Sequence, residues 1–392
     1  MPEDLTPAHR SIEAEIRAKG PITFARFMEV ALYGEHGYYT SHVTAGADYA
    51  TSPQMHPAFG ALIAGYLYKA WQALGEPETF DVIELGAGDG GLSKDILDSV
   101  SINASKREPA LRGFKHSLSY HPVDIQPRGS ARPIEEPPKP DPITGCVISN
   151  ELLDAFPTHI FTIRNKRVFE LYVDIDENNS FHFIEDQPSS NEIITRIGDL
   201  ASTLPDGYRG EVNLRIRDWA INVKSLLNSG YVLTIDYGHQ RDALYHPARY
   251  EGSIRCYRDH VLGQNPFRHI GQQDITAHVD FTAIREAMFE IVFTEIAPLQ
   301  TQRDFLFDLG IGEYIQQIRL DLSQTLDRIK SNTLMLQLRS INALIDARSL
   351  GNFKVAQFAL NAPTIDLNGL EHNPTFPSPR PNPRHLSYLP YD

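Results

Sequence analysis

Three glycines at alternate positions, set between an apolar segment and a helical segment, constrain this chain more than any other feature. Gly86, Gly88 and Gly90 follow residues 80–85, whose apolar character predicts a buried parallel strand. Residues 92–100 carry apolar side chains at helical spacing and predict a helix directly after the glycines. Because glycine has no Cβ, such a turn can bend sharply and let a ligand approach the backbone. The N–H groups at the start of the following helix add a positive pole for that ligand.

The glycine spacing by itself leaves two ligand classes open. Gly86, Gly88 and Gly91 fit the dinucleotide pattern G-x-G-x-x-G, whereas Gly90 as the third glycine gives G-x-G-x-G. Glu84, two residues before the first glycine, distinguishes the two classes. A pyrophosphate gains nothing from a carboxylate there, but the ammonium and sulfonium groups of S-adenosylmethionine are attracted to it. The motif therefore favours a methyltransferase over a dinucleotide enzyme, and a glycine turn without a ligand is the third alternative.

Composition argues against several classes of partner. The 392 residues include 36 Lys and Arg against 50 Asp and Glu, which gives a formal net charge of −14. Nonspecific nucleic-acid binding and binding to an anionic membrane both need a basic surface, so neither is expected. Cys146 and Cys256 are too few for a disulfide framework or a cysteine zinc site. No two histidines have ligand spacing beside an acid, so no metal is predicted.

The sequence also bears on location. No stretch approaches 18 apolar residues, so no membrane span is predicted. The first twenty residues have no hydrophobic signal core, and the acids among them count against a transit peptide. A cytoplasmic location is therefore expected, with the mitochondrial matrix as the alternative if a presequence was removed. The oligomeric state stays open.

Strand and helix signals alternate from about residue 55 onward, as is typical of α/β folds. Helices are predicted at 58–71 and over most of 300–349, and strands at 120–124, 146–150, 231–238 and 354–360. Residues 167–186 predict a hairpin that turns at 177–179, and residues 127–142 predict a loop. Together with the ligand turn, this alternation predicts a doubly wound Rossmann-like sheet with an inserted substrate-covering α+β region.

This fold implies a division of the chain into seven segments. They are an N-terminal segment that contributes to the active-site cover (1–56), the first part of the S-adenosylmethionine domain (57–163), an inserted hairpin and helical region (164–215), a helix and strand of that domain (216–238), a substrate-covering region (239–345), the final strand of the sheet (346–362) and a proline-rich tail expected to be extended or mobile (363–392).

Polar residues end several of the predicted strands, and in doubly wound sheets ligands lie outside the carboxyl ends of the strands. Asp124 ends the strand after the glycine turn and is expected to accept hydrogen bonds from a ribose diol. Asn150 and Glu151 end the next strand and are expected to meet the adenine or methionine part of the cofactor. Asp236 and Tyr237 end the later strand and are candidates for substrate binding.

The separation between the glycine turn and Asp124 exceeds the usual twenty or so residues. An inserted loop around residues 100–118 would account for the difference.

Ordered sequence blocks give nearly the whole chain a resemblance to one family. In chain order the blocks are residues 20–22, 27–28, 37–39, 48–53, 150–157, 236–238, 255–257, 274–281 and 351–355. They resemble the mitochondrial dysfunction protein A (MidA) family of class I methyltransferases. The resemblance implies S-adenosylmethionine as the cofactor. Since mitochondrial members methylate an arginine of a respiratory complex I subunit during assembly, it also implies a protein arginine as the acceptor.

The resemblance extends to single positions. It implies that Thr51 and Ser52 contact the cofactor. Ala87 and Asp89 stand where family members commonly carry proline and a basic residue, and Gln54 stands where glutamate is usual. These departures do not prevent cofactor binding on physical grounds, but they bear on the substrate.

Methylation of a guanidinium group sets demands that particular side chains could meet. The group is protonated near neutral pH, so carboxylates must orient it, and a proton must leave as the new bond forms. Glu151 and Asp154 would share a face if the turn between them is helical, and we predict them as acceptor-binding carboxylates, with Asp154 facing the substrate. His278 is a candidate proton acceptor, and Tyr38 and Tyr39 are candidates for the pocket wall. A capping role for Asp154, a structural role for His278 and simple packing of the tyrosines are the alternatives.

Three functions other than protein arginine methylation stay open at this point. The first keeps the cofactor and transfers the methyl group to a small molecule or a peptide natural product. The second is a catalytically idle assembly factor on a methyltransferase fold. The third is a dinucleotide oxidoreductase.

Overall fold

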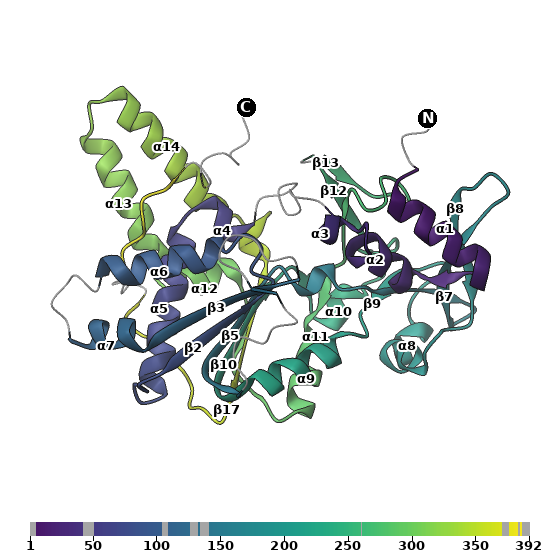
Figure 1. Cartoon of the computed structure of the whole chain (residues 1–392), viewed down its shortest axis with the longest axis horizontal. Helices are drawn as coiled ribbons and strands as arrows, with labels where there is room; N and C mark the ends of the chain where they lie inside the picture. The colour runs from purple at the N-terminus through teal and green to yellow at the C-terminus, as the bar shows by residue number, and fades with distance from the viewer. Residues whose placement is uncertain are drawn as a thin grey trace. The chain divides into compact units, whose positions relative to one another are not determined.

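The computed structural model describes residues 5–41, 51–103, 109–125, 132–133, 141–259, 261–370, 376–382 and 385. The chain divides into two compact units, each made of three segments (Figure 1). The first unit comprises Met1–Tyr49, Leu152–Ala220 and Tyr237–Ala287, and the second comprises Ala50–Glu151, Ile221–Asp236 and Met288–Asp392. Residues 239–345, predicted as one substrate-covering region, are therefore divided between the two units.

The second unit is built on a seven-stranded sheet in the order β16-β17-β10-β5-β2-β3-β4 (Figure 1). Its strands are β2 (Phe80–Leu85), β3 (Leu118–Asp124), β4 (Arg132–Pro133), β5 (Ile143–Asn150), β10 (Leu227–Asp236), β16 (Thr294–Thr301) and β17 (Lys354–Leu360). The pairs from β4 to β10 are parallel, and β17 runs antiparallel to both of its neighbours. The predicted doubly wound sheet is confirmed, with β2 at the point where the strand order reverses.

Helices cover this sheet. They are α4 (Ser52–Met55), α5 (Ala58–Ala73), α6 (Gly91–Asn103), α7 (Pro109–Ser117), α12 (Gln302–Asp308), α13 (Ile311–Gln324) and α14 (Arg328–Ala343), and a 3-10 turn, η3 (Leu350–Asn352), precedes the last strand. Val82 and Ile148 pack against α5 and α6 in one hydrophobic core, while the alternate residues Ile83 and Val147 are buried as well. Both faces of the strands are therefore covered, which explains why their sequences are continuously apolar.

The interval predicted as an inserted loop around residues 100–118 is helical where the structure describes it. The helix α6 continues to Asn103, and α7 occupies residues 109–117. Leu111 and Phe114 of α7 are buried in the core, so an amphipathic helix lengthens the connection from the glycine turn to Asp124. The predicted loop at 127–142 falls mostly outside the described residues.

The first unit contains a five-stranded antiparallel sheet. Its strands are β1 (Ile22–Thr23), β6 (His159–Arg164), β7 (Arg167–Ile175), β8 (Phe181–Asp186) and β9 (Arg209–Val212). The pair β7 and β8 confirms the predicted hairpin, and the Asp176 N–H closes its turn by donating to the Ser180 carbonyl at 3.0 Å. Asn179 has a φ of +62° within this turn, a conformation that asparagine adopts more readily than most residues.

The remaining elements of the first unit are short. They are α1 (Pro7–Lys19), α2 (Phe24–Tyr33), α3 (Tyr38–Ser41), η1 (Leu153–Ala155), α8 (Asn191–Ile197), η2 (Gly198–Ser202), β11 (Gly238–His239), α10 (Arg241–Leu244), β12 (Arg255–Arg258), β13 (Val261–Gly263), β14 (Asp274–Thr276) and β15 (Val279–Asp280). Two helices, α9 (Ile216–Leu226) and α11 (Phe281–Glu290), continue from the first unit into the second. Phe24, Phe27 and Met28 of α2 are completely buried and form the centre of one core with Ile160 and Val173 of the sheet.

The proline-rich tail is anchored at several points. Residues 361–370 form no helix or strand, but Ile365 and Leu370 are buried in the core of the second unit. The Tyr231 hydroxyl donates to the Pro363 carbonyl at 2.8 Å. Phe376, further along the described part of the tail, is 1% exposed. The described part of the tail is thus packed onto the second unit.

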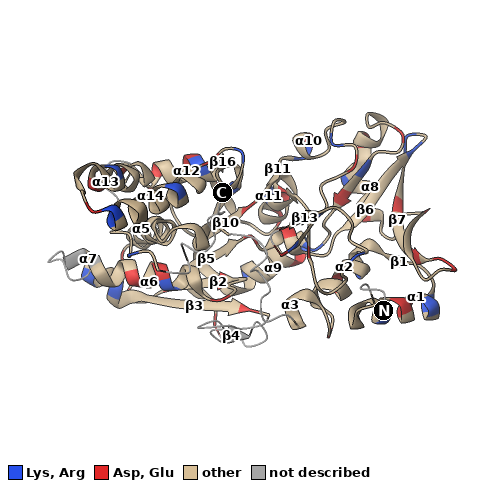
Figure 2. Cartoon of the chain, turned by 90° about the horizontal axis from the view of Figure 1, so that it is seen from above, with Lys and Arg blue, Asp and Glu red and all other residues tan. Residues whose placement is uncertain are grey.

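Charged residues of both signs are mixed along individual helices, as Figure 2 shows for α1, α6 and α12. On α6, for example, Lys94 pairs with Asp98. Among the described residues, no helix combines the length and the apolar character that crossing a membrane requires.

Candidate active site

The glycine turn of the second unit adopts backbone conformations that favour glycine. Gly86, Gly88 and Gly90 have φ angles of +74°, +57° and +76°, in the left-handed region where a Cβ costs about 1–2 kcal/mol per residue. A Cβ placed on Gly88 would meet no described atom within 4 Å. The predicted sharp turn is therefore present, and its backbone is open to a ligand at Gly88.

Asp124 holds this turn from the neighbouring strand. Its Oδ2 accepts a hydrogen bond from the Gly88 N–H at 2.8 Å. The Val123 carbonyl accepts from the N–H groups of Gly86 and Ala87 at 3.0 and 3.1 Å. Asp124 is half-buried at the carboxyl end of β3, and a carboxylate has about four acceptor positions. It can therefore hold the turn and also accept hydrogen bonds from a ribose diol.

Two of the departures from the family pattern have local structural roles. Asp89 Oδ1 accepts a hydrogen bond from the Gly91 N–H at 2.9 Å, at the start of α6. Gln54 Oε1 accepts from the Thr51 N–H at 3.1 Å, an arrangement that glutamate forms equally well in a capping box. Asp89 therefore supports the start of α6, after Gly90, and Gln54 supports the start of α4, after Thr51. Gly90 and Thr51 are both predicted cofactor residues.

Glu84 lies within the sheet. It is 4% exposed, and its Oε2 accepts a hydrogen bond from the Tyr120 hydroxyl at 3.0 Å. Burial, with the nearby charge of Glu84, raises the pKa of Tyr120, so the hydroxyl keeps its proton and remains a donor. The attraction between Glu84 and the cofactor ammonium stays a prediction, and Tyr120 is a partner of Glu84 that the sequence did not reveal.

Asn150 and Glu151 lie at the end of β5, beside the point where the strand order reverses. Glu151 has a φ of +52°, a conformation that is strained for this residue type and is concentrated at functional sites. Its Oε1 accepts hydrogen bonds from the Ser52 N–H at 3.3 Å and from Asn150 Nδ2 at 3.0 Å. Its own N–H donates to the Ile235 carbonyl at 2.8 Å. The structure thus brings together three of the predicted cofactor residues.

The side chain of Ser52 has a partner inside the second unit. Its hydroxyl donates to Gln302 Oε1 at 2.9 Å, and Gln302 Nε2 donates to the Leu344 carbonyl at 2.9 Å. Both Ser52 and Gln302 are completely buried. The Ser52 backbone N–H therefore donates to Glu151 at the carboxyl end of β5. The Ser52 hydroxyl fixes α4 against α12.

Asn150 presents an acceptor atom at the same edge. Within the described parts of the chain, its Oδ1 is buried and accepts no hydrogen bond, a state that buried polar atoms rarely adopt in a native structure. The amino and hydroxyl groups of S-adenosylmethionine are donors that such an oxygen can accept from. With the open backbone at Gly88 and the carboxylate of Asp124, these residues fit that cofactor at the carboxyl ends of β2, β3 and β5.

Asp154 belongs to the first unit, within the 3-10 turn η1. The helical face that it was predicted to share with Glu151 is absent, because Glu151 has a left-handed backbone and precedes the turn. The Tyr237 hydroxyl donates a hydrogen bond to the Asp154 carboxylate. The capping alternative for Asp154 stays a prediction.

The ionisation of Asp154 suits a cationic partner. The residue is 4% exposed, and burial raises its pKa to about 6, while the hydrogen bond from Tyr237 acts in the opposite direction. Burial and the charge of Asp154 raise the pKa of Tyr237 as well. At neutral pH the carboxyl is mainly ionised, and a carboxylate with such a pKa can also accept a proton near the working pH.

His278 lies beside Tyr237, with the two ring centroids 5.6 Å apart. Burial lowers the pKa of His278 to about 3, and the charges of His239 and Arg249 act in the same direction. The imidazole is therefore neutral and a weak proton acceptor at neutral pH. This favours Asp154 over His278 as the group that takes up a proton.

Tyr38 and Tyr39 are part of an aromatic group in the first unit. Their ring centroids are 5.1 Å apart, and Tyr39 also stacks on Tyr33 at 5.5 Å. The Tyr39 hydroxyl donates to Asp274 Oδ1 at 2.9 Å, and the Tyr33 hydroxyl donates to the Ala155 carbonyl at 2.8 Å. Tyr33 connects this group to the turn that carries Asp154, and neither Tyr33 nor Asp274 was singled out from the sequence.

Asp236 and Tyr237 are adjacent in sequence but belong to different units. Asp236 is completely buried at the end of β10, opposite Lys354 of β17. Tyr237 is the partner of Asp154 described above. Substrate contact by Asp236 stays a prediction.

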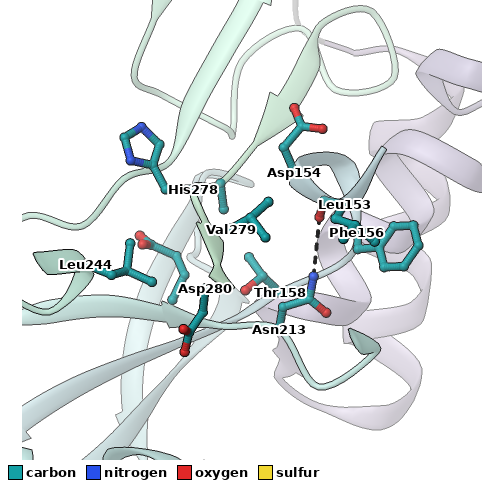
Figure 3. A pocket seen from close by; sticks show the side chains of 11 residues that line it. Leu153, Asp154, Phe156, Thr158, Asn213, Leu244, His278, Val279 and Asp280 are labelled. Carbon is teal, nitrogen blue, oxygen red and sulfur yellow. Dashed lines mark hydrogen bonds between the residues drawn. The ribbon is translucent and has the colours of Figure 1, made fainter. Parts of the chain in front are cut away.

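A small cavity lies within the first unit, and Figure 3 shows its lining residues. Its volume of about 10 Å³ is enough for about one water molecule. Thr158 lines it, and among the described residues the Thr158 hydroxyl has no hydrogen-bond partner. Figure 3 shows the Asp154 carboxylate directed away from Thr158 and Val279. The cavity is too small for a cofactor or an amino-acid side chain.

Proteins named as protein arginine methyltransferases are similar to this chain over most of its length. Protein arginine methyltransferase NDUFAF7 of Homo sapiens, named as mitochondrial, is 26% identical over 349 residues, which cover 78% of this chain and 74% of that protein. The homologous protein of Drosophila melanogaster, also named as mitochondrial, is 25% identical over 71% of this chain and 70% of its own length. These names do not support the cytoplasmic location expected from the sequence.

A solved structure agrees with the fold described above. A protein of Burkholderia thailandensis, crystallised with S-adenosylhomocysteine, superposes with a TM-score of 0.78 at 26% identity, over 92% of this chain and 94% of that one. Residues 62–296 also match the family model for S-adenosyl-L-methionine-dependent methyltransferases. The chain therefore belongs to this family of S-adenosyl-L-methionine-dependent methyltransferases.

Proposed function

We propose that this methyltransferase transfers a methyl group to an arginine side chain of a protein. The observation that carries the proposal is the buried carboxylate of Asp154, held by the hydroxyl of Tyr237 and raised in pKa to about 6. The names of the two relatives, both protein arginine methyltransferases, support the same acceptor. A respiratory complex subunit is the first protein to test, because those relatives are named as mitochondrial.

Asp154 supplies what a guanidinium acceptor needs. A guanidinium stays protonated at neutral pH and presents planar N–H donors, so an ionised carboxylate orients it and localises its charge. The Tyr237 hydroxyl fixes the carboxylate that faces the acceptor. Aromatic rings attract the face of a guanidinium, and Tyr38 and Tyr39 are the candidates for this contact.

Other steps of the reaction are cofactor binding and proton uptake, and different residues of the chain would perform them. When bound, S-adenosylmethionine supplies an activated methyl group on a cationic sulfur. Gly88, Asp124 and Asn150 are the residues that would hold it, through open backbone, carboxylate and amide oxygen respectively. As the new bond forms, the acceptor nitrogen loses a proton, and Asp154 takes it up. His278, with its pKa lowered to about 3, remains neutral beside Tyr237.

The experiment uses the full chain, methyl-labelled S-adenosylmethionine and two sets of acceptors. One set is protein, including respiratory complex subunits and matched peptides with Arg or Lys at one position, and the other is a small-molecule extract. Label in methylarginine after hydrolysis supports the proposal. Label confined to small molecules, or to lysine, would overturn the arginine acceptor, and failure to bind S-adenosylhomocysteine would instead indicate an idle assembly factor.

Substitution of Asp154 tests its role within the same assay. Asp154→Asn should lower the rate of arginine methylation about 100-fold, a loss typical of removing one charge that stabilises a transition state. Its affinity for S-adenosylhomocysteine should stay within about twofold. Asp280→Asn is the matched control, because Asp280 is also buried in the first unit with a raised pKa but caps α11 through Thr282 and Ala283. Equal losses in both variants would contradict the specific role of Asp154.

A further inference from the structure

The tail contacts the helices that follow and precede the glycine turn. Phe376 packs against Tyr68 of α5 and Phe114 of α7, with ring centroids 5.9 and 6.0 Å apart. The Tyr314 hydroxyl of α13 donates to the Phe376 carbonyl. These contacts all lie within the second unit, and they fix the tail beside α5, α7 and α13.

Beyond Phe376, one buried polar contact joins the tail to α6. His385 Nε2 lies 2.9 Å from Asp95 Oδ2, and the side chains are 0% and 3% exposed. His385 Nδ1 accepts a hydrogen bond from the Asn382 N–H at 3.2 Å. Nε2 therefore carries the ring hydrogen and donates it to the Asp95 carboxylate. A buried hydrogen bond to a charged group is among the stronger contacts in a protein.

Asp95 lies near the start of α6, close to the glycine turn. It lies four residues after Gly91, where the helix begins, and the Gly90 carbonyl accepts from Ser93 Oγ at 2.7 Å and from the Lys94 N–H at 3.1 Å. On the side facing α5, a Cβ placed on Gly60 would lie 2.6 Å from the Asp95 Cβ. Asp95, one turn after the start of α6, is therefore held between α5 and the tail.

We propose that His385 is a positioning residue for the cofactor site. Acting through Asp95, it fixes the start of α6 and thereby the conformation of Gly86–Gly90, where we propose that S-adenosylmethionine binds. The contact spans 290 residues of sequence, so it forms only when the tail is docked. The inference depends on the cofactor of the family and is independent of the proposed arginine acceptor.

The test compares three variants of the full chain. His385→Ala removes the donor to Asp95, and His385→Gln retains an N–H that can reach it. Tyr314→Phe is the matched control, because it removes another contact of the tail, a partly buried one, without touching α6. The measurements are the dissociation constant of S-adenosylhomocysteine by calorimetry at a temperature where every variant is folded, and hydrogen exchange of the backbone amides of residues 90–95.

His385→Ala should weaken the binding of S-adenosylhomocysteine about tenfold and accelerate exchange at residues 90–95, since a hydrogen bond to a charged group is lost. His385→Gln should restore affinity to within about threefold, and Tyr314→Phe should lower stability with affinity unchanged. A purely structural role predicts the opposite result: reduced thermal stability in His385→Ala with normal affinity and normal exchange. That result would overturn the proposal.

If His385→Ala does not fold, Asp95→Asn replaces it. This variant keeps an acceptor for His385 and removes the charge, which roughly halves the strength of the hydrogen bond. A loss of affinity of about threefold supports the proposal, and unchanged affinity overturns it. Because no acceptor enters these measurements, their failure is distinguishable from failure of the proposed function.

Discussion

The two units place carboxylates in contrasting surroundings. In the second unit, Asp124 is half-buried at a strand end and shares a hydrogen bond with the backbone of Gly88. In the first unit, Asp154 is buried, and its pKa is raised to about 6. Surroundings of the first kind suit binding, because the carboxylate is partly accessible to solvent. Surroundings of the second kind suit chemistry, because the ionisation of the carboxyl responds to pH near neutrality.

The proposed cofactor site accordingly depends little on unusual side chains. The second unit presents a ligand mainly with backbone that is free of Cβ atoms at Gly88 and with the amide oxygen of Asn150. The first unit instead presents a pair of side chains, Asp154 and Tyr237, and each of them shifts the pKa of the other. Substitutions in the two units should therefore affect different steps.

The largest expected effect is on the glycine turn. Gly88→Val should weaken the binding of S-adenosylhomocysteine about 100-fold, because it strains a φ of +57° and places a branched side chain in the open space beside the turn. Gly75→Val is the control, since Gly75 has a φ of +82° and equally open surroundings but precedes β2. Calorimetry should show normal affinity in Gly75→Val. Similar affinities in the two variants would remove the glycine turn from the cofactor site.

The next effect is the pH dependence of methylation, which should follow Asp154. Its folded pKa of about 6 exceeds the ordinary value of 3.8. Its contribution to stability is therefore present below pH 3.8 and lost as the pH rises through about 6. Activity should change in the opposite direction, because only the ionised form orients a cation. Arginine methylation should rise about tenfold between pH 5 and pH 7, with S-adenosylhomocysteine affinity nearly constant.

The variant Tyr237→Phe tests whether Asp154 sets this pH dependence. Loss of the hydroxyl that stabilises the ionised carboxylate should move the rise in activity to higher pH. A pH profile that is identical in wild type, Tyr237→Phe and Asp154→Asn would contradict the contrast between the two units.

A smaller effect is expected at Asp124. Asp124→Asn keeps an oxygen that accepts from the Gly88 N–H, but it loses the charge that strengthens hydrogen bonds from a ribose diol. Affinity for S-adenosylhomocysteine should fall about fivefold, since charge-assisted hydrogen bonds are roughly twice as strong as neutral ones. Asp98→Asn, which removes an exposed carboxylate of α6, is the control. Equal affinity in these two variants would exclude Asp124 from binding the cofactor.

The smallest effect concerns Gln54, where family members usually carry glutamate. Gln54→Glu should leave S-adenosylhomocysteine affinity and thermal stability unchanged, because either side chain can accept from the Thr51 N–H. Arginine methylation should be unchanged as well. A marked gain or loss of methylation at constant affinity would show that this position contacts the acceptor and that the capping role is incomplete.

Much of the proposed cofactor site, at the carboxyl ends of β2, β3 and β5, could be predicted from the sequence. Its main parts are recognisable from short stretches of sequence. The glycine turn, the strand before it and the helix after it lie within some twenty consecutive residues, and Asp124 and Asn150 stand at strand ends that periodicity reveals. The error over residues 100–118 has a local cause too, since α7 has only nine residues, which is shorter than the window over which helical periodicity is recognised. The shared helical face of Glu151 and Asp154 was wrong because spacing alone does not reveal a positive φ at Glu151.

Other features depend on contacts between distant parts of the chain. The partners Tyr120 for Glu84, Gln302 for Ser52 and Tyr237 for Asp154 come from separate elements. The raised pKa of Asp154 is a consequence of burial, which no single segment determines.

The sequence by itself determined the strand–turn–helix unit, the alternation that builds the sheet and the class of cofactor, because backbone preferences and hydrophobic periodicity act over a few neighbouring residues. The tertiary structure alone decided which carboxylates are buried, which hydroxyls hold them and where the tail docks. Ionisation and hydrogen bonding depend on the dielectric surroundings and on partners that only folding brings together, as the contact between Asp95 and His385 across 290 residues illustrates.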